Sequence, residues 1–374
     1  MVGLTGGVDG DDDGPVVSEV ESESAFAALG GWRGVLGRLV AGQDLGADEA
    51  GVALGEILAG AATSAQIAAF IVALRMKGET VEEMTGLVRA MLAHAEPLVV
   101  PGELVDTCGT GGDRSRSINV STIAALVVAG AGARVCKHGG RAASSAAGSA
   151  DVLEALGVVI DLGPAGVARC IEEAGIGFCF APRFHPAMRY AVPVRGELGV
   201  ATVFNFLGPL ANPARARLQV VGVSDPAMAQ TMLGVLVANG ARRAMVVHGA
   251  DGLDELSTTG PSSIIAAGED GEVRRTTVTP EALGLAPTTL DQLRGGDAAE
   301  NAGVVRRVLA GERGPHRDIA VLNAAAGLVV AGVSPDLAQG VERARAVIDG
   351  GDALDALDRL VRTSQAAADE VPAP

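Results

Sequence analysis

The sequence predicts an α/β protein in which a small all-helical N-terminal region precedes a larger region built on a mostly parallel sheet. Residues 26–95 repeat apolar side chains at helical spacing and show no strand pattern. From residue 104 onward, short apolar strands alternate with helices, which is typical of a sheet covered by helices. The 374-residue chain is 48% hydrophobic but only 2% aromatic, so Ala, Val, Leu and Ile must fill a sizeable core.

The N-terminal region divides into a tail and a small bundle. Residues 1–25 are rich in Gly, Asp and Glu, and we expect a disordered acidic tail. Residues 26–95 then predict about four helices, because breaks fall near residues 43–45, 60–64 and 77–80. Thr63 or Ser64, and Thr80, are expected to cap two of these helices.

The remaining elements follow from the alternation of apolar runs and breaks. Strands are predicted at residues 104–108, 134–136, 158–162, 178–180, 218–223 and 243–248, with surface loops or short strands over 268–300. Helices are predicted at residues 117–131, 149–156, 164–174, 226–239, 301–310, 318–331, 335–349 and 351–366, with helical pieces in the proline-rich stretch 183–213.

Charge and cysteine usage narrow the class of protein. The net charge of −16 and the pI of about 4.7 disfavour nucleic acid and anionic membranes as partners, since both require a basic surface. The longest apolar runs are too short to span a bilayer, and no basic residue precedes Arg33, so no secretory signal is expected. The four cysteines match no common zinc pattern, which favours reduced thiols in a cytoplasmic protein.

Two loops rich in small residues lie at strand-to-helix junctions and suit a polyphosphate. The turn Gly109–Asp113 can bring backbone N–H groups close to an anion, and Ser117–Thr122 adds hydroxyl groups at a helix start. Lys137 and Arg141 add positive charge before a second loop over residues 144–149. A single glycine motif is equally consistent with an ordinary turn, but two such loops about 30 residues apart favour one shared phosphate-binding pocket.

A second cluster of polar residues follows the strand predicted at residues 243–248. Asp254 and Glu255 are adjacent oxygen ligands that could bind Mg²⁺, although a solvated acidic loop is the alternative. Arg195 lies among apolar residues and prolines, where it could pair with a carboxylate or be an ordinary surface arginine. His138 and His185 could be functional or structural, and their spacing does not decide between these roles.

These residues together resemble the anthranilate phosphoribosyltransferases, enzymes of tryptophan biosynthesis. The similarity runs in the family's order from about residue 30 to about residue 365. The matching motifs are Gly109–Asp113, Asn119–Thr122, Lys137–Gly139 with Arg141–Ser145, Gly148–Asp151 before Leu153–Gly157, Arg183–Pro186, Phe204–Asn205 through Leu207–Leu210 to Asn212–Pro213, and His248–Gly249 with Gly252–Glu255.

The resemblance implies both a domain plan and a reaction. A helical domain of residues 26–100 and about 188–213 would be hinged to an α/β domain of residues 101–187 and 214–370. Family members are homodimers that associate through their helical domains. They transfer the phosphoribosyl group of phosphoribosyl pyrophosphate to the amine of anthranilate, with Mg²⁺ as the cofactor.

The resemblance also assigns residues of this chain to roles. Lys137, His138 and Arg195 would be catalytic, and Ser121, Asp254 and Glu255 would hold Mg²⁺. Gly109, Gly140 and Arg195 would contact anthranilate. Phosphoribosyl pyrophosphate would contact Gly109, Gly112, Asp113, Ser117, Asn119, Val120, Ser121, Thr122, Lys137, His138, Gly139, Gly140, Arg141, Ala142, Ala143, Ser144, Ser145 and Ser149.

One position departs from the family pattern. Members usually read Lys-His-Gly-Asn-Arg where this chain has Gly140 in place of Asn, so an amide that would reach the acceptor is missing. One alternative is therefore a paralogue that uses the same donor with another aromatic acceptor. A pyrimidine nucleoside phosphorylase of the same fold and a non-catalytic relative that binds nucleic acid are two further alternatives, which do not depend on this position. The sequence assigns no general base and no number of magnesium ions.

Overall fold

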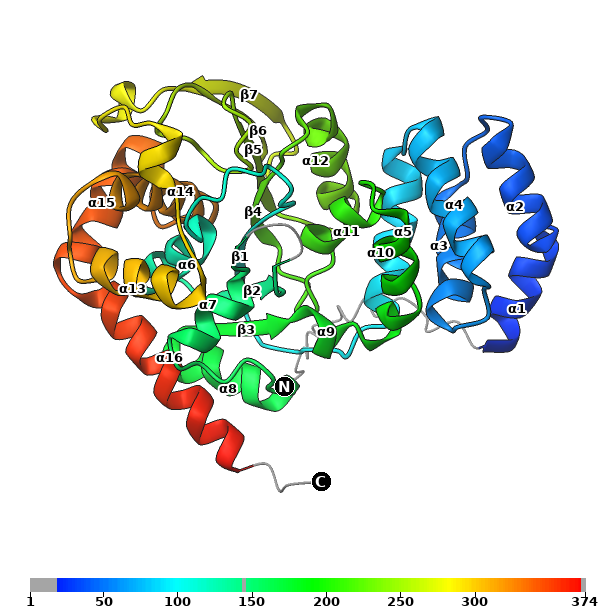
Figure 1. Ribbon diagram of the computed structural model, residues 1–374, viewed down its shortest axis with the longest axis horizontal. Coiled ribbons are helices and arrows are strands. Elements are labelled where there is room, and N and C mark those ends of the chain that lie inside the picture. Colours follow the sequence, from blue (N-terminus) through cyan, green and yellow to red (C-terminus); the bar gives the residue numbers. More distant parts are fainter. Residues whose placement is uncertain (1–18, 143–145, 371–374) are drawn as a thin grey trace, which may run out of the picture.

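The computed structural model describes residues 19–142 and 146–370, and Figure 1 shows a helical region beside a larger region built on a sheet. Among the described residues, no helix is long and apolar enough to cross a membrane. Two apolar cores are present, one on each side of the sheet, and the second continues into the helical region.

In the part of the chain that the structure describes, five helices of the helical region precede the sheet. Thr63 and Thr80 cap two of them as predicted, since their hydroxyl groups accept hydrogen bonds from the backbone N–H of Gln66 and Glu83. The tail was predicted too long, because residues 19–25 already belong to a helix; residues 1–18 lie outside the described part. The helices are α1 (Glu19–Ala28), α2 (Gly31–Val40), α3 (Ala47–Leu58), α4 (Ser64–Lys77) and α5 (Val81–Ala93).

A seven-stranded sheet forms the centre of the larger region, in the order β3-β2-β1-β4-β5-β6-β7. The first five strands in that order are parallel, and β6 and β7 add an antiparallel edge. The strands are β1 (Val105–Gly109), β2 (Val135–Gly139), β3 (Ile176–Phe180), β4 (Leu218–Gly222), β5 (Arg243–Gly249), β6 (Ser262–Ala267) and β7 (Val273–Val278).

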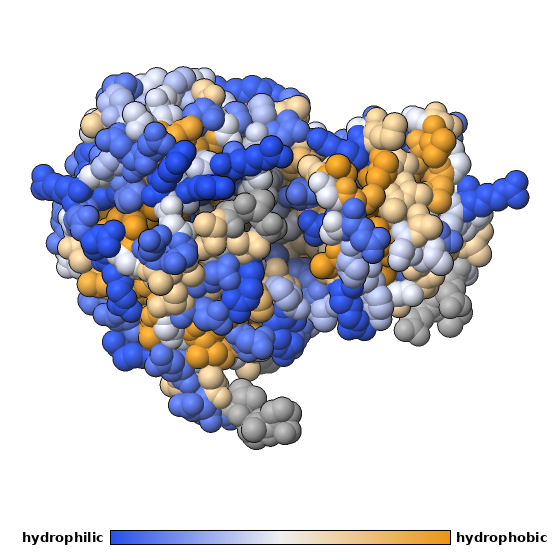
Figure 2. All heavy atoms as spheres, viewed as in Figure 1, coloured by the Kyte–Doolittle hydropathy of each residue, from blue (hydrophilic) through white to orange (hydrophobic). Residues whose placement is uncertain are grey.

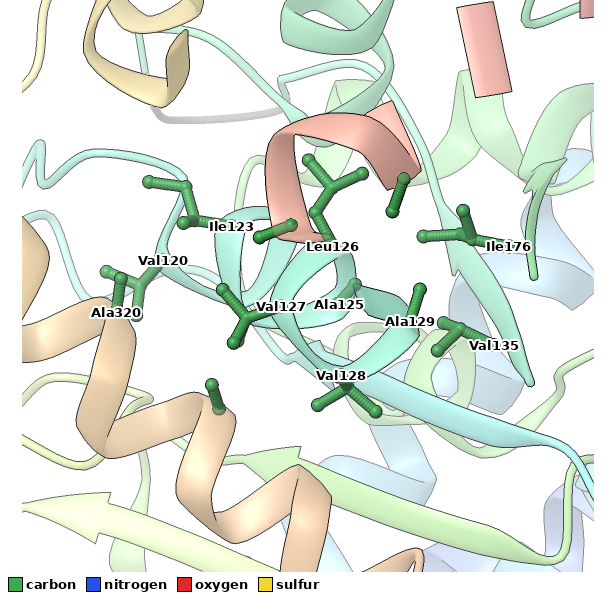
Figure 3. Packing of buried hydrophobic residues seen from close by; sticks show 14 of the residues in the cluster. Val120, Ile123, Ala125, Leu126, Val127, Val128, Ala129, Val135, Ile176 and Ala320 are labelled. Atoms are coloured by element: carbon green, nitrogen blue, oxygen red, sulfur yellow. The ribbon is translucent and has the colours of Figure 1, made fainter. Parts of the chain in front are cut away.

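Helix α6 (Val120–Gly130) lies at the centre of the first core and, after Ser121 and Thr122 in its first turn, is apolar on all sides, as expected of a buried helix. Figure 3 shows its side chains pointing outward in all directions, with Ala320 of α14 on one side and Val135 of β2 on the other. The other helices around this core are α7 (Ser149–Ala155), α8 (Pro164–Ala174), α13 (Ala298–Leu309), α14 (Pro315–Val330), α15 (Leu337–Asp349) and α16 (Asp352–Asp369).

On the opposite face of the sheet, α12 (Ala229–Ala238) packs between β5 and α5 and joins the two regions. The chain also returns to the helical region after β3 and the short helix α9 (Ala181–Phe184). There α10 (Val192–Leu198) packs against α4 and α11 (Phe204–Leu210) against α5, as Figure 1 shows. The second core therefore includes side chains from both parts of the chain.

The structure differs from the predicted strands in two places: one predicted strand does not form, and one strand was not predicted. Residues 158–162 alternate buried and less buried side chains but pair with no strand, because the N–H of Val158 donates to Leu153 and that of Val159 to the hydroxyl of Ser364 on α16. Residues 262–267 were not assigned, yet they form β6 and pair with both β5 and β7. In each case long-range partners decide the outcome, and local sequence does not contain them.

Candidate active site

The candidate site lies where the sheet changes its direction of winding. Strand β1 pairs with β2 on one side and with β4 on the other, and all three strands are parallel. The loops that follow β1 and β4 therefore leave the sheet at the same edge. Ligands of open α/β sheets bind at such a point, outside the carboxyl ends of the strands. Here the two loops are joined, because the hydroxyl of Thr110 accepts from Ser224 N at 3.1 Å and that of Ser224 donates to Gly111 O at 2.9 Å.

The loop after β1 has an unusual backbone. Gly111 and Gly112 have φ angles of 66° and 82°, and Arg114 and Arg116 also lie in the left-handed region, at 58° and 57°. A non-glycine residue rarely adopts this conformation, and alternation of backbone handedness turns successive N–H groups toward a common anion. The loop thus has the backbone expected of a phosphate-binding segment.

Lys137 brings a positive charge to the centre of this edge. Its side chain is 2% exposed, and Nζ donates to Thr107 O at 2.6 Å and to the Ser121 hydroxyl at 3.3 Å. Beneath it, the buried Asp106 accepts from His138 N at 3.3 Å and from the Asn212 amide at 2.8 Å, while its burial raises the pKa of its carboxyl group. Among the described residues Lys137 has no ion pair, so its charge remains available to a ligand.

Asp254 and Glu255 lie directly beside the loop after β1. Asp254 accepts from Gly111 N at 2.7 Å, and Glu255 accepts from Ser121 N at 3.1 Å. Burial and the charge of Asp113 raise the pKa of Asp254 to about 6, and burial and the charge of Asp254 raise that of Glu255 well above its ordinary value. The three predicted magnesium ligands, including Ser121, are therefore brought together.

This donor set fits a magnesium ion. Two adjacent carboxylates that are partly removed from water and repel each other gain stability when a hard cation lies between them. Among the residues that the structure describes, no three His, Cys, Asp or Glu side chains gather into a site that could hold a metal ion. Mg²⁺ commonly binds through one or two carboxylates and completes its shell with water and substrate phosphates, so two carboxylates are sufficient here.

Arg195 belongs to α10, on the side of the helical region. Its guanidinium group lies 5.4 Å from the ring centroid of Phe204 on α11, and burial lowers its pKa. Within the described part of the chain it makes no ion pair, which is uncommon for a half-buried arginine. It is therefore suited to receive an anionic group.

His138 and His185 lie between the donor side and the helical region. Their ring centroids are 5.2 Å apart, and Nδ1 of His138 lies 3.2 Å from Gly208 O on α11. Burial lowers the pKa of His138 to about 3, so its imidazole is neutral at pH 7. Its Nε2 is buried without a hydrogen-bond partner among the described residues.

Two glycines at the end of β2 differ in the space around them: Gly139 has no room for a Cβ, and Gly140 does. A Cβ at Gly139 would strike the Ser149 hydroxyl, whereas one at Gly140 would meet only Ala181 Cβ, at 4.0 Å. The Asn of the family pattern would therefore fit the backbone space at position 140. Among the described residues, no contact to a Cβ at this position closer than 4.0 Å takes the place of that Asn.

Some predicted donor residues have other partners. Arg141 forms ion pairs with Asp151 and Glu154, both at 2.8 Å, so its charge is already balanced. Asp113 accepts hydrogen bonds from Ser115, and Val120 and Thr122 are buried in α6. The contacts of these three residues with phosphoribosyl pyrophosphate remain predictions. Ala142 N donates to Asp151, while the predicted contacts of residues 143–145 lie outside the described residues.

Two residues of the site were missed by sequence reasoning. Gly222 at the end of β4 would carry its Cβ 2.5 Å from the carbonyl carbon of Asp254, so only glycine fits there. Asn323 on α14 binds both backbone groups of Leu256, at 2.9 and 2.8 Å, and thereby fixes the residue after Glu255. A glycine at the end of an apolar strand gave a weak signal for the first, and nothing local indicated the second.

The space-filling view shows a hollow between the two regions of the molecule, beside the carboxyl edge of the sheet (Figure 2). Loops after β1, β2, β4 and β5 face it from one side, and α10 and α11 belong to the other. A ligand with a phosphate end and an organic acid end could thus contact both sides. The arrangement defines a site for an anionic ligand with groups from both regions.

Comparisons with known proteins agree with this description. Residues 33–95 match a model described as the helical bundle domain of a glycosyl transferase family, and residues 101–354 match the a/b domain of that family. The anthranilate phosphoribosyltransferases of Thermomicrobium roseum and a Nocardioides species are 56% and 58% identical to this chain, covering 90% and 88% of it and 99% and 98% of their own lengths.

Solved structures give the same result. The anthranilate phosphoribosyltransferase of Thermus thermophilus is 44% identical, with a TM-score of 0.84 over 88% of this chain and 99% of its own. That of Saccharomyces cerevisiae in complex with PRPP and Mg is 26% identical, with a TM-score of 0.81 over 94% of this chain and 99% of its own. The chain belongs to the anthranilate phosphoribosyltransferase family.

Proposed function

We propose that this protein transfers the 5-phosphoribosyl group of phosphoribosyl pyrophosphate to the amine of anthranilate and releases pyrophosphate. The observation that carries the proposal is the division of charge across the hollow. Lys137 and the loop after β1 offer a phosphate site next to Asp254 and Glu255, while Arg195 offers a carboxylate site on the helical side. The comparisons favour none of the alternative functions.

The donor is expected to bind at the carboxyl edge of the sheet. Lys137 and the N–H groups of the loop after β1 would stabilise the negative charge that develops on the departing pyrophosphate. Asp254, Glu255 and Ser121 would hold Mg²⁺, which supplies further positive charge at the phosphates. These groups are held by the protein before the donor arrives, so little reorganisation is needed.

The acceptor is expected to lie between the donor and α10. Arg195 would pair with the carboxylate of anthranilate and orient its amine toward the ribose carbon that loses pyrophosphate. An aryl amine is neutral at pH 7, so its lone pair is free without a strong base. The neutral His138 borders this region, and positioning the two substrates would supply much of the acceleration.

Closure of the two regions over the substrates would exclude water and limit hydrolysis of the donor. Contacts between the regions are already present: α12 packs against α5 through apolar side chains, and polar contacts lie beside this packing. Arg75 of α4 lies 3.4 Å from Asp225 in the loop after β4, and Arg89 of α5 donates to Asn239 at 3.3 Å. We propose that these two regions are the hinged domains expected from the sequence.

We also propose a homodimer and a cytoplasmic location. Val40 of α2 and Met76 of α4 are 80% and 84% exposed, and Figure 2 shows apolar residues gathered over the helical region. The four cysteines are free and buried, in keeping with a reducing compartment. Light scattering of the wild-type protein and of Met76→Glu tests the dimer, since a buried charge there should shift the mass toward the monomer.

The test of the reaction follows the loss of anthranilate fluorescence with purified protein, phosphoribosyl pyrophosphate and Mg²⁺. A saturable loss of signal that requires all three components supports the proposal. Release of pyrophosphate with other aromatic acceptors but not with anthranilate would show that the donor site is right and the acceptor wrong. The space at Gly140 would then define the acceptor.

A further inference from the structure

The segment before α13 crosses the outer side of the donor loop. Ile118 N donates to Leu293 O at 3.0 Å, and Gly295 N donates to Arg116 O at 2.8 Å. Ser117 and Arg294 form an antiparallel bridge between the same two segments. The last part of the loop that follows β1, residues 116–118, is thus paired with residues 293–295, far away in sequence.

Asn301 continues this contact with its side chain. It lies in the first turn of α13, is 2% exposed, and accepts from Gly296 N at 2.8 Å. Its amide donates to the side-chain oxygen of Asn119 at 2.9 Å, and the amide of Asn119 in turn donates to Ala147 O at 3.0 Å. One chain of hydrogen bonds therefore links residue 296, the donor loop and the loop that precedes α7.

The start of α13 does not depend on Asn301. Asp297 caps the helix by accepting from Glu300 N at 2.9 Å, and Glu300 accepts from Asp297 N at 3.2 Å. The Asn301 amide is therefore committed to the loops rather than to its own helix. Gly295 passes so close that its Cβ would lie 3.0 Å from the amide carbon of Asn301.

We propose that Asn301 is a positioning residue that, through Asn119, sets the distance between the phosphate-binding loop after β1 and Ala147 in the segment before α7. This inference rests on the proposed donor site at those loops. Phosphoribosyl pyrophosphate carries phosphate groups at two ends, so its binding needs both loops at a fixed separation. The acceptor site on α10 lies outside this chain of hydrogen bonds.

The direction of the hydrogen bonds makes the substitution Asn301→Asp informative. A carboxylate at 301 can still accept from Gly296 N, but it places an acceptor against the oxygen of Asn119. If Asn119 turned its amide around, its oxygen would face the carbonyl of Ala147. One hydrogen bond of the chain is lost in either orientation, while the volume of the side chain is preserved.

The experiment compares wild type, Asn301→Asp and the control Ser364→Ala. Ser364 is a fully buried residue of α16 whose hydroxyl accepts from Val159 N at 3.1 Å, so its variant also loses a buried hydrogen bond between elements. We expect Asn301→Asp to raise the KM for phosphoribosyl pyrophosphate about tenfold, with the KM for anthranilate within about twofold of wild type. The control should have a lower melting temperature than wild type but no selective rise in the KM for phosphoribosyl pyrophosphate.

Binding without turnover gives a second measurement. Pyrophosphate with Mg²⁺ should raise the melting temperature of wild type and of Ser364→Ala by similar amounts, and that of Asn301→Asp by less. A double-mutant cycle with Asn119→Ala should show that Asn301→Asp adds little to the donor KM once Asn119 is absent.

Equal rises in both KM values, or additive effects in the cycle, would overturn the positioning role. A donor KM unchanged in Asn301→Asp would do the same. A wild-type protein that neither consumes phosphoribosyl pyrophosphate nor is stabilised by it would refute the proposed function itself, and this inference with it.

Discussion

Replacing Gly222 with alanine should push Asp254, a proposed magnesium ligand, away from the end of β4. The added Cβ would lie 3.3 Å from the Cα of Asp254 and 2.5 Å from its carbonyl carbon. The carbonyl oxygen of Asp254 would be the nearest atom of all. Ordinary contacts begin at 3.4 Å, so the carbonyl carbon of Asp254 alone must retreat by about 0.9 Å, and its carbonyl oxygen must retreat further. Glu255 is bonded to Asp254 and must move with it.

A displacement of this size is large for a catalytic site. Misplacing reacting groups by about 1 Å can cost roughly a hundredfold in rate, so kcat/KM for the donor should fall by about that factor. The overlap should also cost about 1–3 kcal/mol of folding free energy. We expect a steeper requirement for Mg²⁺ as well, because Asp254 would no longer accept from Gly111.

The assay is the loss of anthranilate fluorescence over a range of Mg²⁺ concentrations, together with urea unfolding. Gly37→Ala is the matched control, because a Cβ at this exposed position in α2 meets nothing within 4 Å. It should gain up to about 1 kcal/mol of stability and keep wild-type kinetics. Wild-type kcat/KM and Mg²⁺ dependence in Gly222→Ala would refute the reasoning, whatever its stability.

Further substitutions test single groups of the site. Lys137→Ala should lower kcat/KM for the donor about a hundredfold, and unchanged donor kinetics would rule out its role at the phosphates. Arg195→Ala should raise the KM for anthranilate at least tenfold and leave that for the donor alone, whereas equal changes in both would argue against a carboxylate contact. Gly140→Asn should keep the wild-type melting temperature, since its Cβ meets only Ala181 at 4.0 Å, and should alter the KM for anthranilate more than that for the donor. The pKa of His138 is lowered to about 3 in the folded protein. Below about pH 6.5 the imidazole therefore binds a proton in the unfolded chain but not in the folded one. The free energy of unfolding should then decrease as the pH falls below 6.5, by at most about 1.4 kcal/mol per pH unit. His138→Gln should show a shallower decrease in urea unfolding between pH 7.5 and pH 5, and an equal slope would contradict this assignment.

Local sequence predicted those parts of the fold that depend on near neighbours. The helix at residues 164–174 was placed correctly, because Pro164 suits its first turn and Gly175 can adopt the left-handed conformation that ends it. The caps at Thr63 and Thr80 depend on residues three positions away. Each of these signals is complete within one turn of helix.

The parts that sequence reasoning missed depend on distant partners. The segment 158–162 has a strand-like alternation, but a helix near the C-terminus takes one of its N–H groups. Arg141 was assigned to the donor from its charge and from the family motif, and neither of these shows its ion pairs with Asp151 and Glu154. The need for glycine at 222 arises from Asp254, which is 32 positions later in the chain.

The charges of the site explain how a protein with a net charge of −16 can bind a polyanion. Of its two lysines, Lys77 is tied to Asp44 and Glu83 in the helical region, whereas Lys137 donates to a carbonyl and a hydroxyl group. The nearby carboxylate of Glu255 has a raised pKa, so its charge is costly unless a cation accompanies it. The site therefore favours a ligand that arrives with its own divalent cation over a bare anion.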